Sequence, residues 1–155
     1  MAASAWQLYN SAKKYIGNGT ITLGAGNFKM ALANSASNAS TFTLDTFGSL
    51  TGEISATGGY TSGGKDLVPA TGQWTVGASA KQMKFTYSTV GLTFTASGSA
   101  LTNVKYAVIT HAASAGGGSA RKLLCFCQLS SSQFTVASPN TLTVLPAGTG
   151  VFTLT

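Results

Sequence analysis

The chain has 155 residues, and only 8% of them are charged, against about 25% in ordinary soluble domains. This length suits a single domain, and the scarcity of charge means that hydroxyl-bearing and small side chains cover its surface, which favours a protein packed against copies or partners. Nine basic residues face three acidic ones, for a formal net charge of +6, but a single arginine and no basic run longer than two argue against direct nucleic-acid binding.

The N-terminal segment, residues 1–18, is predicted to be helical. Ser4 is a candidate N-cap with Gln7 three residues later, which is the spacing of a capping box. Gly17 is a natural stop, so the helix is expected over residues 4–16. The apolar face at helical spacing consists of Trp6, Tyr9, Ala12 and Ile16.

From residue 19 the hydrophobic period changes to two, and residues 19–155 are predicted to form a single β domain. The runs 104–109 and 123–127 are continuously apolar, which indicates the interior of a sheet, and residues 51–71 are expected to be a long structured loop. The remaining strands are expected at 20–23, 27–33, 73–76, 82–87, 92–96, 134–136, 141–145 and 151–154.

The sequence therefore predicts an all-β fold, a compact sandwich or jelly-roll-like barrel of about eight short strands with one short N-terminal helix. Cys125 and Cys127 lie two apart on a predicted strand, so both face one side and are expected to be small buried apolar residues. No stretch approaches the roughly 20 apolar residues of a membrane span. The N-terminus lacks a basic, apolar leader, so the chain is expected to be made and kept in a cytoplasmic compartment.

Few side chains in the chain can carry acid–base or metal chemistry, and we expect no enzyme, cofactor or metal site. The candidates are Asp45, Glu53, Asp66 and His111, and none of them sits in a recognisable motif. The segment Gly59–Lys65 fits the first seven positions of a phosphate-binding loop, but Asp66 stands where the motif needs Ser or Thr. We interpret it as a glycine-rich turn.

Several stretches of the chain, in order, resemble a family of small bacteriophage virion proteins. In the family the central segment reads leucine-threonine-asparagine-glutamate-valine and later glycine-glycine-lysine-threonine-leucine, whereas this chain has Gly52 for the asparagine and Asp66 for the threonine. The matching stretches are Ala12–Ile21, Phe28–Leu32, Ser35–Asn38, Leu50–Ile54, Gly59–Leu67, Phe94–Ala96, Tyr106–Ile109 and Gly150–Thr155.

The family resembles capsid decoration, or cement, proteins, which are β-rich and clamp neighbouring major capsid subunits, often as trimers. The resemblance implies a place on the capsid surface of the virion, the major capsid protein as partner, self-association as a homotrimer, and stabilisation of the DNA-filled head. Two alternatives remain open: a tail- or fibre-associated module that binds a carbohydrate or receptor through Tyr60, Trp74 and the glycine loops, or a head–tail connector component.

Large aromatic and basic side chains in segments of weak strand pattern indicate where a partner is bound. The expected interface residues are Trp6, Tyr9, Lys13, Lys14, Tyr60 and Lys65. The alternative is that Trp6 and Tyr9 plug an open end of their own barrel.

Overall fold

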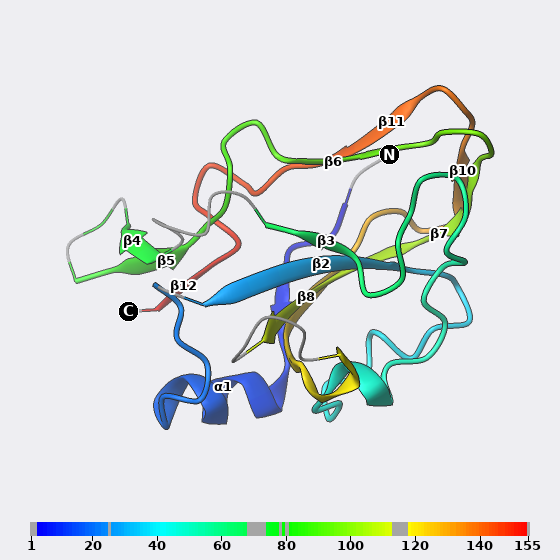
Figure 1. Ribbon diagram of the computed structural model, residues 1–155. Helices are drawn as coiled ribbons and strands as arrows, with labels where there is room; N and C mark the ends of the chain where they lie inside the picture. The colour runs from blue at the N-terminus through cyan, green and yellow to red at the C-terminus, as the bar shows by residue number, and fades with distance from the viewer. Residues whose placement is uncertain are drawn as a thin grey trace.

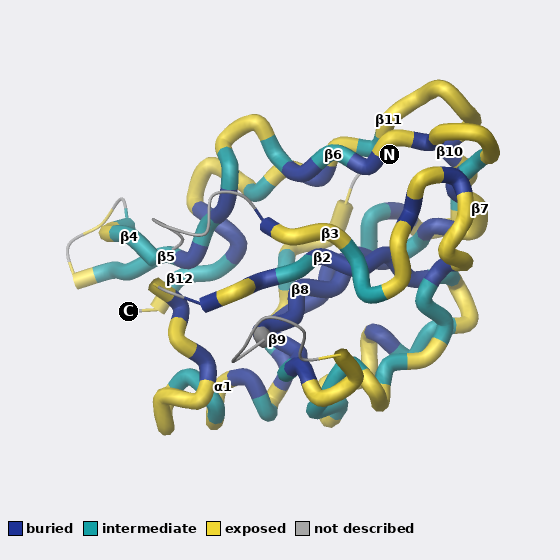
Figure 2. The backbone as a smooth tube through the Cα atoms, viewed as in Figure 1, coloured by how far each residue is buried: buried dark blue, intermediate teal, exposed yellow. Residues whose placement is uncertain are grey.

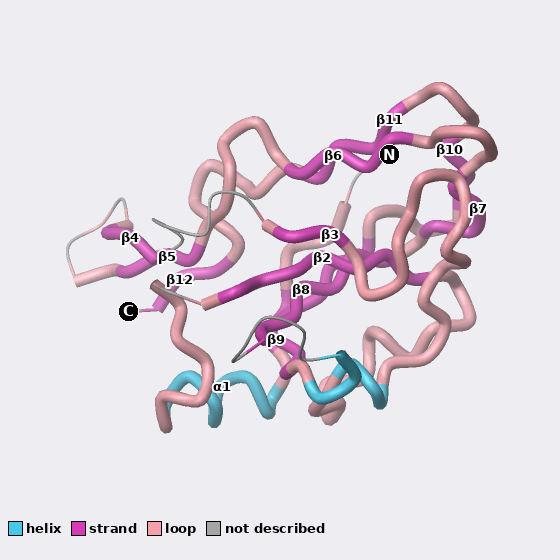
Figure 3. Tube along the Cα trace, in the orientation of Figure 1, coloured by secondary structure: helices cyan, strands magenta, loops and turns pink. Residues whose placement is uncertain are grey.

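The computed structural model describes residues 3–24, 26–67, 74–77, 79, 81–112 and 118–154. These residues form an all-β fold with one short α-helix, consistent with a sandwich, as the sequence predicts (Figures 1 and 3). The elements are β1 (Gln7–Leu8), α1 (Asn10–Gly17), β2 (Asn27–Ala33), η1 (Phe47–Ser49), β3 (Lys65–Asp66), β4 (Trp74–Val76), β5 (Met83–Phe85), β6 (Leu92–Thr95), β7 (Leu101–Val104), β8 (Tyr106–Ala112), η2 (Gly118–Ala120), β9 (Lys122–Gln128), β10 (Phe134–Val136), β11 (Thr141–Val144) and β12 (Phe152–Leu154).

A five-stranded antiparallel sheet, in the order β1-β9-β8-β2-β3, forms the centre of the molecule. The two continuously apolar runs of the sequence are its interior strands β8 and β9, which confirms their expected place. In β9, every residue from Leu123 to Cys127 is buried. A strand covered on both faces has no polar side to alternate with, which is why its sequence pattern is continuous.

Three smaller antiparallel sheets surround this centre: β10-β7, β11-β6 and the three-stranded sheet β12-β5-β4. In the view of Figure 1, the β6–β11 ribbon lies above the five-stranded sheet, α1 lies below it, and the three-stranded sheet stands at one end. The described chain has twelve strands rather than about eight. The extra strands include β1 and β3, which have two residues each, too few for an alternation to be visible in the sequence.

The expected start of the helix is wrong. The helix begins at Asn10, after an extended Tyr9, and the residues before it form an arm that runs along β9. The Ser4 N–H donates to the Gln128 carbonyl (2.8 Å), and the Ser4 hydroxyl accepts the Gln128 N–H (2.9 Å). The exposed edge of β9 satisfies this backbone better than a first helical turn would, since helix N-termini leave their N–H groups unpaired.

The strand expected at 20–23 is also absent, because residues 18–22 form turns after the helix; Ile21 and Leu23 are buried all the same. The strand at 27–33 is confirmed as β2, with the expected bounds. The region 51–71 is a loop as far as Lys65, where β3 pairs with β2, and its residues 68–71 lie outside the described part of the chain.

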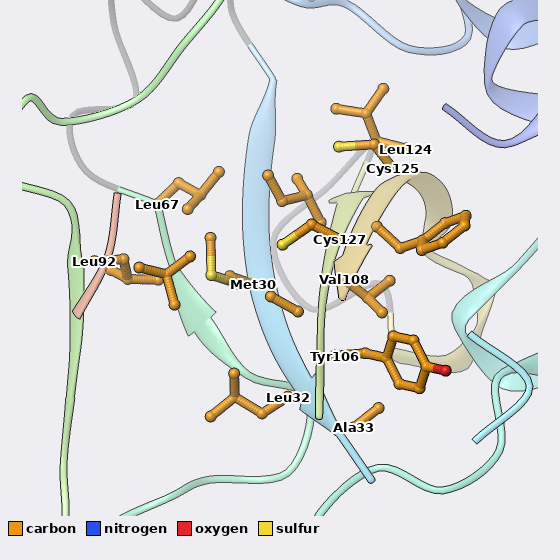
Figure 4. Close-up of a cluster of buried hydrophobic side chains, with 14 of the residues drawn as sticks. Met30, Leu32, Ala33, Leu67, Leu92, Tyr106, Val108, Leu124, Cys125 and Cys127 are labelled. Atoms are coloured by element: carbon orange, nitrogen blue, oxygen red, sulfur yellow. The ribbon is translucent and has the colours of Figure 1, made fainter. Parts of the chain in front are cut away.

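Side chains from β2, β8 and β9 fill the core with those of the surrounding segments (Figure 4). Figure 2 colours much of these central strands as buried. Cys125 and Cys127 are buried in it as free thiols, as expected. Burial raises the pKa of the Cys127 thiol to about 12 and that of Cys125 well above its ordinary value. Within the described residues, no helix has the length and apolarity needed to cross a lipid bilayer.

Candidate partner-binding surface

Tyr9, one of the six expected interface residues, lies in the core of its own chain and does not reach a partner. Its side chain is fully buried. The hydroxyl donates to the Ala39 carbonyl (2.7 Å), and the ring packs against Phe126 with centroids 5.2 Å apart. The alternative that this tyrosine plugs its own fold therefore holds for Tyr9, because the arm folds back onto β9 and carries the ring inward.

Tyr60 is buried as well, and its hydroxyl completes the edge of β2. It accepts the Leu32 N–H (3.1 Å) at a point on β2 that β3 no longer covers, and it donates to Oε1 of Glu53 (2.7 Å). Burial, assisted by this bond to Glu53, raises the pKa of Tyr60. The expectation that Tyr60 faces a partner is wrong, because an unpaired buried strand N–H needs an acceptor and this hydroxyl provides it.

The other four expected residues reach the surface but do not gather in one place. Trp6 is half-buried on the arm beside β9, whereas Lys65 lies on β3, at the opposite edge of the five-stranded sheet. Lys13 and Lys14 are exposed on α1. A single interface that contains all four would have to extend around the sheet.

Glu53 organises the glycine-rich loop from inside, a role that no sequence motif signals. Its Oε1 accepts the Gly63 N–H (2.6 Å) and its Oε2 accepts the Ser62 hydroxyl (2.9 Å), in addition to the Tyr60 bond. A Cβ on Gly64 would overlap the Met30 carbonyl, and the φ of +80° at Gly64 favours glycine. The loop is thus a tight turn packed on β2. Its Gly63 N–H is already bonded to the Glu53 carboxylate of the same chain.

The remaining titratable groups lie apart from one another. Asp66 pairs with Lys29 (2.8 Å) and Asp45 with Lys122 (3.4 Å), while His111 is buried on β8. Among the described residues, no three His, Cys, Asp or Glu side chains come together as a metal ion would require. With nine bases and three acids in the chain, the lysines outside these pairs leave the surface net positive.

The three-stranded sheet carries an apolar row that continues beyond the core. Trp74, Phe85 and Phe152 are opposite one another across β4, β5 and β12, and Phe85 is fully buried against Phe28, with ring centroids 4.9 Å apart. Because alternate residues of a strand share a face, the next row on this face is Val76, Met83 and Leu154.

This second row, which we call the overhanging row (Val76, Met83 and Leu154), is open to solvent at its two ends, and Met83 between them is half-buried. Val76 is 72% exposed and Leu154 is 40% exposed. Figures 1 and 2 show the sheet that carries it at one end of the molecule. Neighbouring apolar side chains at a projecting position suit contact with another protein. The alternation in 82–87 predicts which face Met83 takes, but the sequence does not reveal the two strands that pair with it.

A second apolar surface lies beside the N-terminal arm. It is a groove of about 630 Å³ lined by Trp6, Leu129, Phe134, Leu142, Pro146 and Val151 among others. Leu145, at its rim, is 56% exposed. The half-buried state of Trp6 is explained by its position in this wall, so the indole packs partly on its own chain and partly faces the groove.

Comparison of the chain with protein-family models, with curated proteins and with solved structures finds no match. The arrangement of the described residues is therefore what bears on function.

Proposed function

We propose that this protein is a bacteriophage capsid decoration protein, which binds adjacent major capsid subunits and stabilises the DNA-filled head as a structural, non-catalytic component of the virion. The observation that carries the proposal is the overhanging row, in which Val76, Met83 and Leu154 continue a core face into solvent. The sequence resemblance and the hydroxyl-rich, sparsely charged surface support it, because such a surface is inexpensive to desolvate in a lattice.

A clamp of this kind adds contact area to a shell whose subunits already associate. An ordinary interface buries roughly 800 Å² per partner, so many copies together raise the energy needed to open the shell. The excess of basic over acidic residues suits an acidic capsid surface. Attachment should then weaken at high salt without being abolished, since the apolar contacts are not screened.

The overhanging row is tested with Val76→Asp. Burying a valine side chain contributes about 1.5–3 kcal/mol, so the variant should bind purified heads at least about 10-fold more weakly. Val90→Asp is the matched control, because Val90 is 78% exposed and lies in the turn before β6, away from the row. Co-sedimentation with heads that lack the protein measures the affinity of each variant. Equal binding of the two variants would exclude the row as the capsid contact.

The function itself is tested on the particle. Heads with and without the protein are heated while DNA release is recorded, and heads with it should release DNA at the higher temperature. Quantification of the protein in purified virions separates the alternatives: a decoration protein is present in hundreds of copies, a tail, fibre or connector component in few. Equal release temperatures, or a low copy number, would contradict the proposal.

A further inference from the structure

The only arginine of the chain, Arg121, is buried between the two 3-10 helices, and only 5% of its surface is exposed. One terminal nitrogen, Nη1, donates to the Gly63 carbonyl (2.8 Å), and the guanidinium lies over the ring of Phe47, 4.2 Å from its centroid. These contacts hold the side chain in place, but both partners are neutral.

The charge of Arg121 lacks an ionic partner among the described residues. The two ion pairs found there join Lys29 to Asp66 and Lys122 to Asp45. Glu53 and Asp66 lie close enough to favour the charged form, but neither forms an ion pair with the guanidinium. The oxygens of Glu53 accept bonds from Tyr60, Ser62 and Gly63 instead. The Nε atom of Arg121 is shielded from solvent and has no hydrogen-bond acceptor. Burying a cation without an ion pair costs several kcal/mol.

Arg121 also lines a pocket of about 480 Å³ on this side of the molecule. Lys29, whose charge is paired with Asp66, also contributes to the lining. Phe47 and Leu50 make part of the lining apolar, and the hydroxyl-bearing residues Ser62 and Ser119 lie beside them. The described lining contains no acidic side chain. The pocket thus combines positive charge with apolar walls and hydroxyl groups.

We propose that this pocket binds a carboxylate group opposite Arg121. The planar guanidinium matches the geometry of a carboxylate, and a partly apolar pocket suits a carboxylate carried on an aliphatic stem. Such a group is supplied either by a small organic acid or by an aspartate or glutamate side chain of a partner protein. This inference does not depend on the decoration function.

The test is a titration of the ¹⁵N-labelled full chain, followed by NMR at constant ionic strength. Acetate represents the free acid, N-acetyl-glutamate amide represents an acidic side chain in a peptide, and sodium chloride is the reference. We expect saturable shifts of the Gly48, Ser62, Gly63 and Ser119 amides with the carboxylates and not with chloride. Tighter binding of the glutamate derivative indicates a partner side chain, and equal binding indicates a small acid.

Arg121→Gln should weaken carboxylate binding about 10- to 100-fold, the loss that corresponds to one charge-assisted hydrogen bond. Lys14→Gln is the control, because it removes the same charge from the exposed face of α1 and should bind as the original protein does. If Arg121→Gln does not fold, the titration of the original protein still decides. Absence of saturable shifts with the carboxylates, the same shifts with sodium chloride, or equal loss of binding in both variants would overturn the proposal.

Discussion

Replacing Tyr60 by phenylalanine should destabilise the fold far more than the loss of one hydroxyl normally does. The Tyr60 hydroxyl is bonded on both sides: it donates to the Glu53 carboxylate and accepts the Leu32 N–H of β2. Tyr60→Phe therefore breaks a bond to a charged group and leaves a buried strand N–H without an acceptor. The lower ends of the ranges apply because Glu53 is only half-buried. They are about 1.5 kcal/mol for the bond to the carboxylate and about 1 kcal/mol for the unpaired N–H.

The expected cost is thus about 2.5 kcal/mol of unfolding free energy, or roughly 5–10 °C in Tm for a chain of this size. Tyr87→Phe is the matched control. Tyr87 is as deeply buried, but its hydroxyl makes a single bond, to the Val144 carbonyl (3.0 Å), so this variant should lose about 1 kcal/mol.

Urea unfolding followed by tryptophan fluorescence measures both variants, and equal m-values show that the unfolding reactions are comparable. A double-mutant cycle with Glu53→Gln gives the interaction energy between the Tyr60 hydroxyl and the Glu53 carboxylate. The reasoning fails if Tyr60→Phe costs no more than Tyr87→Phe, since the second bond of Tyr60 would then contribute nothing.

Three further outcomes follow from the same contacts. Gly64→Ala should lower the stability by at least about 1–3 kcal/mol, because the new Cβ would meet the Met30 carbonyl at a positive φ; an unchanged urea midpoint would contradict this. Burial lowers the pKa of His111 below its ordinary 6.5, so the unfolded chain takes up the proton first. The contribution of His111 to stability is then complete above about pH 6.5 and falls as the pH drops toward the folded-state pKa. His111→Gln should therefore reduce the change in urea midpoint between about pH 7.5 and 5.5. Cys125 and Cys127 should not react with a thiol reagent until the protein unfolds, and rapid labelling of the native protein would show that the core opens there.

The local hydrophobic pattern was sufficient to predict the strands that lie in the core. The alternation over 27–33 and the continuous apolar runs at 104–109 and 123–127 predict β2, β8 and β9, and the structure pairs these three side by side at the centre. The burial of Cys125 and Cys127 follows from the same runs. In such strands the side chains themselves determine the conformation, because few alternatives hide so much apolar surface.

The sequence pattern gave the wrong conformation where a segment pairs with a strand edge that lies far away in the chain. Ser4 is a plausible helix cap by itself, but Gln128, 124 residues away, offers both an N–H and a carbonyl to it, and the arm becomes extended. The exposure of the expected interface residues likewise depends on distant segments. Lys13, Lys14 and Lys65 are exposed as expected, whereas Tyr9 and Tyr60 turn inward to carbonyl and N–H groups of distant segments.

The amino-acid sequence by itself determines the all-β class, the apolar central strands and the shortage of charge, since each of these depends on composition and on neighbours two residues apart. The tertiary structure alone decides which aromatic residues face solvent and how β4 and β12 align Val76 and Leu154 on either side of Met83. It also decides that Arg121 is buried without an ion pair among the described residues. Those features arise from pairing between strands far apart in the chain, and the register of such pairs is set by the packing of the whole core.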